Sequence, residues 1–224
     1  NKVNLNLHWI DADNYDNEDL SNLDGVVVPG GFGVRGIEGK ISAIQYLREN
    51  KVPFLGICLG LQCAVIEYAR NVCGINDANS SEFSQNTKDF VIDLLPNQDL
   101  DKDDVGASMR LGTYPCKIEK NTLTSEIYKD EVIYERHRHR YEVNNKYRDT
   151  LEENGLIFSG LSPDNNLVEM IELKDHPFFV ASQFHPEFKS RPWEPSPIFN
   201  SFIKSASIKT QNKNEATLKT KVKD

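Results

Sequence analysis

A cysteine flanked by two glycines follows a short apolar run, in the segment Gly56-Ile57-Cys58-Leu59-Gly60. This spacing is typical of a sharp strand-to-helix turn that exposes its central side chain at the carboxyl edge of a sheet. A thiol at such a turn faces the N-terminus of the next helix, whose partial positive charge favours thiolate over thiol. An arbitrary cysteine is more often a small buried residue, but this context favours a nucleophile.

A nucleophilic cysteine also needs a proton acceptor and a group that orients the acceptor. Both are available far along the chain, where His185 and Glu187 follow an apolar run that predicts a strand. A His-Pro-Glu tripeptide alone is often only a polar turn. Together with the cysteine turn it predicts a catalytic triad of Cys58, His185 and Glu187.

A glycine-rich turn, Gly31-x-Gly33-x-x-Gly36, follows the apolar run 25–28 and has the outline of a dinucleotide-binding turn. In a dinucleotide fold the next strand ends in an acidic residue that holds the ribose. Here the next strand ends in Cys58. We therefore expect this turn to serve the cysteine site and not a nucleotide.

Strands and helices must alternate to bring these residues together. Short apolar runs predict strands at 3–9, 25–28 and 52–57, and apolar residues at helical spacing predict helices at 37–50 and 59–70. This order is typical of an α/β fold with a parallel sheet. Later β-like pieces predict a mixed or antiparallel extension, at 111–118, 132–136, 156–161, 168–173 and 178–184. Residues 197–205 predict a closing helix.

Two segments have too few apolar residues to predict packed structure. Residues 74–108 are rich in Asn, Asp and Ser, so we expect a long surface excursion with one apolar island at 90–95 and a mobile acidic stretch at Asp99–Asp104. Residues 207–224 are expected to be disordered. The folded domain is therefore expected over residues 1–206.

The composition limits the classes of function. The chain has 224 residues, 38% of them hydrophobic, and a formal net charge of -8. This suits one sizeable core and argues against a basic face for nucleic acid or a membrane surface. The cysteines form no CxxC pair, so reduced thiols and a cytoplasmic location are expected. They are Cys58, Cys63, Cys73 and Cys116. No metal site is expected.

With the cysteine turn and the His-Pro-Glu segment, the chain resembles the class I glutamine amidotransferases of the triad type. The resemblance implies a three-layer, flavodoxin-like α/β fold, in which an open, twisted, mostly parallel sheet is flanked by helices and carries a smaller antiparallel extension. It also implies that the backbone N–H groups of Gly31 and Leu59 form an oxyanion hole. L-Glutamine is the implied substrate, and no cofactor is expected in this domain.

Six longer segments narrow the resemblance to the subfamily whose ammonia serves the ATP-dependent amination of UTP to CTP. They are PGGFGVRGIEGKI, LGICLGLQ, NDANSSEF, MRLG, ERHRHRYEVNN and QFHPEFKSRP. The resemblance implies that Glu82 holds the α-amino group of glutamine and Arg140 its α-carboxylate, since a zwitterion needs one anion and one cation. Further implied contacts are Gly60, Leu61, Gln62 and Tyr141. It places Met109–Gly112 as a lid.

In that subfamily the glutaminase domain follows an N-terminal synthetase domain, and the full-length enzyme is a homotetramer that uses ATP and Mg, with GTP as activator. This sequence has no G-x-x-x-x-G-K-[ST] phosphate loop, so the synthetase domain is expected to be absent from this chain. Two alternatives remain open. One is a γ-glutamyl hydrolase, and the other is a non-catalytic amidotransferase-like interaction module.

Overall fold

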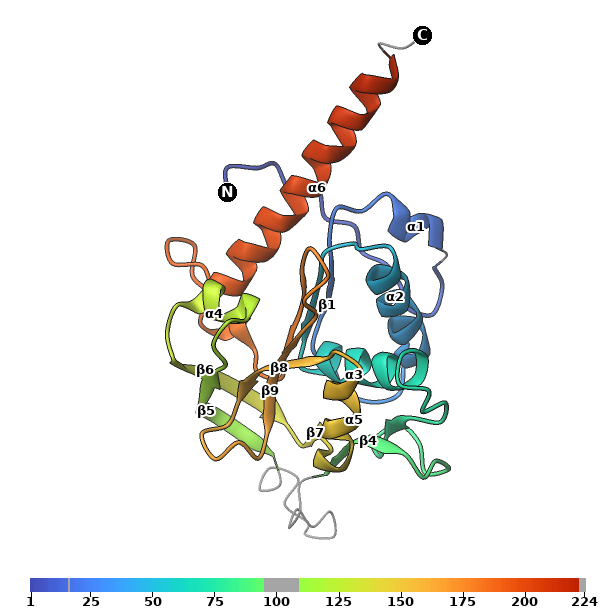
Figure 1. The fold of residues 1–224 in the computed structure, drawn as a ribbon, viewed down its shortest axis with the longest axis vertical. Helices are drawn as coiled ribbons and strands as arrows, with labels where there is room; N and C mark the ends of the chain where they lie inside the picture. Colours follow the sequence, from blue (N-terminus) through green and yellow to red (C-terminus); the bar gives the residue numbers. More distant parts are fainter. Residues whose placement is uncertain (16, 95–108, 222–224) are drawn as a thin grey trace.

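A computed structural model describes residues 1–15, 17–94 and 109–221. Its main element is a seven-stranded sheet between two layers of helices (Figure 1). In spatial order the strands are β1 (Val26–Val28), β2 (Phe54–Ile57), β10 (Phe179–Ser182), β9 (Val168–Glu172), β8 (Ile157–Leu161), β5 (Arg110–Ile118) and β6 (Val132–His139).

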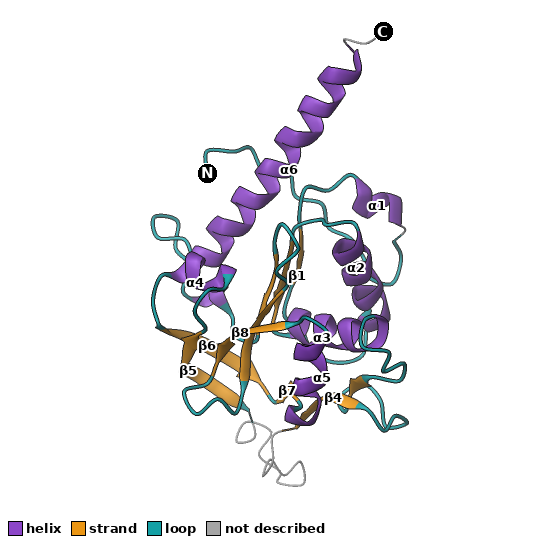
Figure 2. Ribbon diagram, viewed as in Figure 1, coloured by secondary structure: helices purple, strands orange, loops and turns teal. Residues whose placement is uncertain are grey.

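Helices cover both faces of this sheet (Figure 2). One core cluster joins the sheet to α2 (Ile37–Glu49) and α3 (Leu59–Asn71). A second joins its other face to α4 (Leu123–Tyr128) and α6 (Pro197–Lys221). Neighbouring residues of β2 divide between the two clusters, with Phe54 in the first and Leu55 in the second. The continuous apolar run of β2 thus reflects a strand that is buried on both faces.

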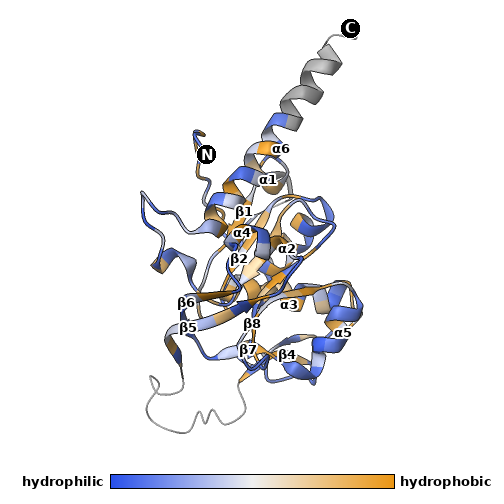
Figure 3. Cartoon of the chain, turned by 60° about the vertical axis from the view of Figure 1, so that its left-hand side comes forward, coloured by the Kyte–Doolittle hydropathy of each residue, from blue (hydrophilic) through white to orange (hydrophobic). Residues whose placement is uncertain are grey.

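A second, smaller sheet lies beside α3, and it contains β3 (Asn79–Ser80), β4 (Phe90–Leu94) and β7 (Tyr141–Val143). The short helices α1 (Asn17–Ser21), α5 (Arg148–Glu153), η1 (Asn145–Tyr147) and η2 (Pro186–Phe188) complete the described elements. The central strands are the most apolar part of the ribbon, and hydrophilic residues gather toward its periphery (Figure 3). Among the described residues, no helix combines the length and apolarity needed to cross a membrane.

The three-layer α/β architecture is confirmed, but the sheet is mixed and not mostly parallel. Among the described residues of this sheet, only the β1–β2 and β2–β10 pairings are parallel, and each further pairing, from β10–β9 to β5–β6, is antiparallel. The reason is the length of the connections. Residues 162–167 join β8 to β9, and residues 173–178 join β9 to β10. Both are too short for the crossover that parallel neighbours require.

Two further expectations are corrected at the ends of the chain. Residues 3–9 form no strand, and the alternating side chains of Val3, Leu5, Leu7 and Trp9 are all exposed. Alternation predicts a half-buried strand only where a neighbouring strand and a core are available to it. α6 continues to Lys221, beyond the expected end at 205. Lys, Gln, Glu and Ala have enough helix propensity to extend it. The expected disorder of residues 207–224 stays a prediction.

The segment 74–108 is structured where it is described. Its apolar island forms β4, and the preceding residues contribute β3. The acidic stretch Asp99–Asp104 lies outside the described residues.

Candidate active site

Cys58 occupies the turn between β2 and α3 in a strained backbone conformation, with φ 51° and ψ -100°. Close packing of the flanking glycines holds the turn. A Cβ on Gly60 would lie 2.2 Å from the carbonyl oxygen of Val28, and one on Gly56 would lie 2.8 Å from the Cβ of Ala181. Only glycine fits at both positions, so the sequence holds Cys58 at the apex of the turn.

His185 follows β10 and is anchored through its backbone, since its N–H donates to the carbonyl oxygen of Arg136 at 2.8 Å. Its Nδ1 lies 2.7 Å from Oε1 of Glu187. Its ring stacks on Phe188 at a centroid distance of 5.0 Å. The buried Nε2 has no hydrogen-bond partner among the residues that the structure describes. This nitrogen is therefore available to exchange a proton with a reacting group.

Gly30 places Cys58 and His185 side by side. A Cβ built on this glycine would lie 2.7 Å from Cε1 of His185 and 3.6 Å from Cβ of Cys58. The structure thus brings together the residues of the predicted triad, which follow the ends of β2 and β10 and lie in η2. The glycine turn approaches the cysteine as expected, because Gly31 lies in the wall of the same cavity.

Burial raises the pKa of the Cys58 thiol to about 12, and the backbone N–H of Leu59 opposes this shift. Desolvation is thus the largest influence on this thiol, and it acts against the thiolate that the turn was expected to favour. Burial also raises the pKa of Cys63 to about 12. The pKa therefore does not distinguish Cys58 from the other cysteines, whereas its position in the cavity does.

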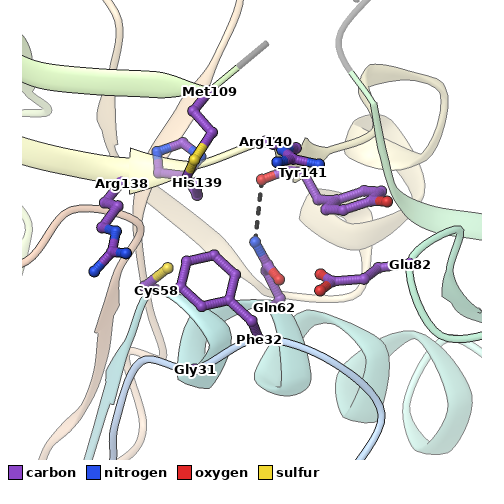
Figure 4. Close-up of a pocket in the computed structure, with 10 residues that line it drawn as sticks. All are labelled: Gly31, Phe32, Cys58, Gln62, Glu82, Met109, Arg138, His139, Arg140 and Tyr141. Atoms are coloured by element: carbon purple, nitrogen blue, oxygen red, sulfur yellow. Dashed lines mark hydrogen bonds between the residues drawn. The ribbon is translucent and has the colours of Figure 1, made fainter. Parts of the chain in front are cut away.

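A cavity of ≈ 420 Å³ opens above the cysteine (Figure 4). Most of the residues expected to contact glutamine are in its wall. The lining residues are Gly31, Phe32, Cys58, Gln62, Glu82, Met109, Arg138, His139, Arg140 and Tyr141. Glu82 and Arg140 both line the cavity, so its wall can receive both an ammonium and a carboxylate group.

Three expected contacts do not line the cavity. Leu59, Gly60 and Leu61 form the buried first turn of α3. Gly60 packs against Val28, and Leu61 belongs to the core. Leu59 stays beside the site through its N–H group, which faces the Cys58 thiol. Gly60 and Leu61 thus stabilise the turn through packing and do not contact the cavity.

Hydrogen bonds tie the cavity walls to one another. Nε2 of Gln62 donates to the carbonyl oxygen of Tyr141 at 3.0 Å and to Oε1 of Gln183 at 3.3 Å. Nε2 of Gln183 in turn lies 3.6 Å from Sγ of Cys58. The N–H of Gly33 donates to Oε1 of Glu82 at 3.0 Å, which fixes the glycine turn against the opposite wall.

Sequence reasoning missed several residues of this site, namely Phe32, Arg138, His139 and Gln183. A signal for two of them was available in the run 132–139. Its side chains are alternately exposed and buried along β6, which is the pattern of a strand with one buried face. The expected lid also differs, because Arg110–Gly112 begins β5 and pairs with His137–His139. Met109 alone contributes to the cavity wall.

A family model described as glutamine amidotransferase class-I matches residues 1–205. The CTP synthase of Caldanaerobacter subterraneus subsp. tengcongensis is 60% identical over 208 residues, which are 91% of this chain and 38% of that protein. The CTP synthase of Bacillus subtilis is 56% identical over 214 residues, which are 94% of this chain and 40% of that protein. This chain therefore spans about two fifths of the length of these relatives.

Solved structures agree with these matches. The Trypanosoma brucei CTPS glutaminase domain with bound acivicin has a TM-score of 0.85 and 40% identity, and the match covers 92% of this chain and 82% of that one. A putative GMP synthase subunit from Thermoplasma acidophilum has a TM-score of 0.58 and 19% identity, over 89% of this chain and 80% of that one, and shares the fold. This chain belongs to the class I glutamine amidotransferase family.

Proposed function

We propose that this chain is a glutaminase domain that hydrolyses L-glutamine through Cys58, His185 and Glu187. The observation that carries the proposal is the position of Cys58 in a cavity whose walls hold Glu82 and Arg140. An amino acid bound there would have its zwitterionic end between the carboxylate and the guanidinium. Its side-chain amide would then point toward the sulfur. The similarity to the T. brucei glutaminase domain supports the same assignment.

Proton transfer starts the proposed reaction. The pKa of Cys58 is raised to about 12, so the thiol holds its proton at neutral pH. His185 takes this proton through Nε2 as the sulfur attacks the amide carbon, while Glu187 holds the ring through Nδ1 and stabilises the imidazolium. The N–H groups of Gly31 and Leu59 receive the negative charge on the amide oxygen.

Collapse of the tetrahedral intermediate breaks the C–N bond, and His185 returns the proton to the departing nitrogen, which leaves as ammonia. A γ-glutamyl thioester remains on Cys58. Water then gives a proton to His185 and attacks the thioester carbonyl, so that glutamate is released and the thiol is restored. Each turnover thus consumes one glutamine and one water, and yields one glutamate and one ammonia.

We further propose that the ammonia serves the amination of UTP to CTP, as the names of the curated relatives suggest. The longer protein would hold a synthetase domain that uses ATP and Mg, with GTP as activator, and would act as a homotetramer in the cytoplasm. Only the glutamine half of the reaction is assigned to the residues of this chain.

The test combines labelling with kinetics. Acivicin is expected to modify Cys58 alone, as mapped by mass spectrometry, and glutamine is expected to protect it. Cys73, which is partly exposed, serves as the internal control for unspecific alkylation. A free glutaminase would also turn over glutamine faster than a γ-glutamyl peptide. The reverse preference would indicate a γ-glutamyl hydrolase, and the absence of any thioester would indicate a non-catalytic module.

A further inference from the structure

Five ionisable side chains are buried together behind the glutamine cavity, and the proposed mechanism uses none of them. They come from four strands, with Arg110 on β5, His137 and His139 on β6, Glu142 on β7 and Glu169 on β9. None is more than 9% exposed. Burial of so many ionisable groups is costly unless they neutralise and hydrogen-bond one another.

These side chains form a closed ring of contacts, which we term the buried ring. Nδ1 of His137 and Nε2 of His139 are 2.8 Å apart. His137 Nε2 is 3.7 Å from Oε2 of Glu169, and His139 Nδ1 is 3.4 Å from Oε1 of Glu142; these are ion-pair distances, and neither nitrogen makes a hydrogen bond to a described residue. Arg110 closes the ring, with 2.6 Å from Nη2 to Oε1 of Glu169 and 3.5 Å from Nη1 to Oε1 of Glu142.

The ring needs one more proton than its ordinary ionisation states supply. Two ionised carboxylates beside one guanidinium would leave an uncompensated negative charge in the interior. Two neutral imidazoles carry two N–H groups in total. Three contacts of the ring each need a donor, namely Glu142–His139, His139–His137 and His137–Glu169. One added proton, on a carboxyl or on an imidazole, satisfies both requirements at once, because it neutralises the ring and supplies the third donor.

The geometry selects which carboxyl carries the proton. Glu169 has the closer contact with the guanidinium, at 2.6 Å against 3.5 Å for Glu142, so Glu169 is the better stabilised anion. Burial raises the pKa of Glu142 well above its ordinary value, and the neighbouring charge of Glu169 adds to the shift. Burial and Arg110 lower the pKa of His137 to about 2 and that of His139 to about 3, so both imidazoles are neutral.

We propose that the buried ring holds its extra proton on Glu142 and that its proton donors point one way, from Glu142 through both histidines toward Glu169, which positions the walls of the glutamine cavity. Both histidines are then protonated on Nε2. This inference rests on the proposed glutaminase function only for its effect on turnover. The protonation pattern itself is a property of the folded chain.

Each part of the ring is connected to the cavity by at most one intervening residue. His139 lies in the wall itself, Arg110 follows the wall residue Met109, and Glu142 follows Tyr141. Glu169 acts through Gln183, since the Glu169 carbonyl oxygen accepts the Gln183 N–H at 2.8 Å and the Gln183 side chain contacts Cys58. The guanidinium of Arg110 lies over the ring of Tyr114, and Tyr114 packs edge-to-face against His137. These residues are positioning residues, because none touches the reacting atoms.

Nitrogen-15 NMR of the histidine side chains in the whole chain tests the protonation pattern directly. The expected spectrum between pH 6 and 8 shows His137 and His139 as neutral Nε2–H tautomers, identified by loss of their signals in His137→Gln and His139→Gln variants. Two Nδ1–H tautomers would place the proton on Glu169 and overturn the proposed direction. An imidazolium at either position would overturn it as well.

Variants of the two carboxylates test the effect on the site. Glu142→Gln keeps a neutral donor, so it is expected to recover most of the kcat/KM for glutamine that Glu142→Ala loses. Glu169→Gln removes the partner charge of Arg110 and is expected to leave KM about tenfold or more above wild type, since hydrogen bonds to charged groups contribute roughly 1.5–3 kcal/mol. Rescue by Gln at position 169 but not at 142 would contradict the proposal.

Thermal unfolding of each variant separates misfolding from displacement of the cavity walls. A variant that remains folded but has a raised KM supports the positioning role, whereas a loss of activity that only follows unfolding contradicts it. If the wild-type chain showed the expected tautomers but no glutamine turnover, the proposed function would fail and the proton assignment would stand.

Discussion

Nδ1 of His185 lies 2.7 Å from Oε1 of Glu187, while the Nε2 of the same ring has no hydrogen-bond partner among the described residues. The carboxylate therefore fixes the orientation of the ring and leaves one nitrogen for proton transfer. Glu187 is 42% exposed, so water can partly replace its carboxylate. The rate of the reaction is consequently expected to depend more on His185 than on Glu187.

The first prediction concerns this difference. His185→Ala removes the group that moves the proton, and Glu187→Ala removes only its orienting partner. We expect the loss of kcat to be roughly 10²-fold smaller for Glu187→Ala than for His185→Ala. Steady-state glutaminase kinetics on the purified chain measure both values. Equal losses would show that the ring cannot act without its carboxylate.

The second prediction concerns Gly30. Gly30→Ala puts a methyl group 2.7 Å from Cε1 of His185, so the ring must leave its position beside Cys58. We expect glutamine turnover to fall by about 10² or more, because small displacements of catalytic groups have large effects on rate. Val34→Ala, on the exposed part of the same turn, is the matched control. Wild-type activity in Gly30→Ala would contradict the assigned geometry.

The third prediction concerns substrate binding by Glu82 and Arg140. Both lie in the cavity wall and would hold the charged groups that glutamine keeps unchanged through the reaction. Glu82→Gln and Arg140→Gln are therefore expected to raise KM by about tenfold or more with a smaller change in kcat, as for loss of uniform binding. Arg136→Gln, on the exposed face of β6, is the control with the same change in charge as Arg140→Gln. A fall in kcat alone would assign these residues to the chemical step.

The fourth prediction uses the buried thiol of Cys63. Burial raises its pKa from 9.0 to about 12 in the folded chain. Between these values the unfolded chain loses a proton that the folded chain keeps, so the stability contributed by this group is complete below pH 9 and declines as pH rises. The slope is at most about 1.4 kcal/mol per pH unit.

Cys63→Ala removes this contribution. Denaturant unfolding of the wild type and the variant between pH 8 and 10.5 measures the difference in slope, which is independent of any constant loss from the smaller side chain. A common slope in both proteins would mean that the thiol titrates alike in the folded and unfolded chains.

Local patterns predicted the parts of the site that depend on local geometry. The glycines around Cys58 specify one turn, and the His-Pro-Glu segment specifies the end of one strand, so both could be found in the sequence. The small sheet was missed because β7 has only three residues and β3 only two, and such short strands owe their existence to pairing with β4. His139 and Gln183 were missed because their place in the site depends on contacts between distant strands.

Arg140 is the only residue between the end of β6 and the start of β7, so it stands where the chain passes from the large sheet to the small one. Glu82 follows β3 of the small sheet, whereas Cys58 follows β2 of the large sheet. A glutamine that spans these groups would bridge two separately hydrogen-bonded units. The length of glutamine would have to match the distance from Cys58 to Glu82 and Arg140. A shorter homologue such as asparagine would then not reach both sheets at once.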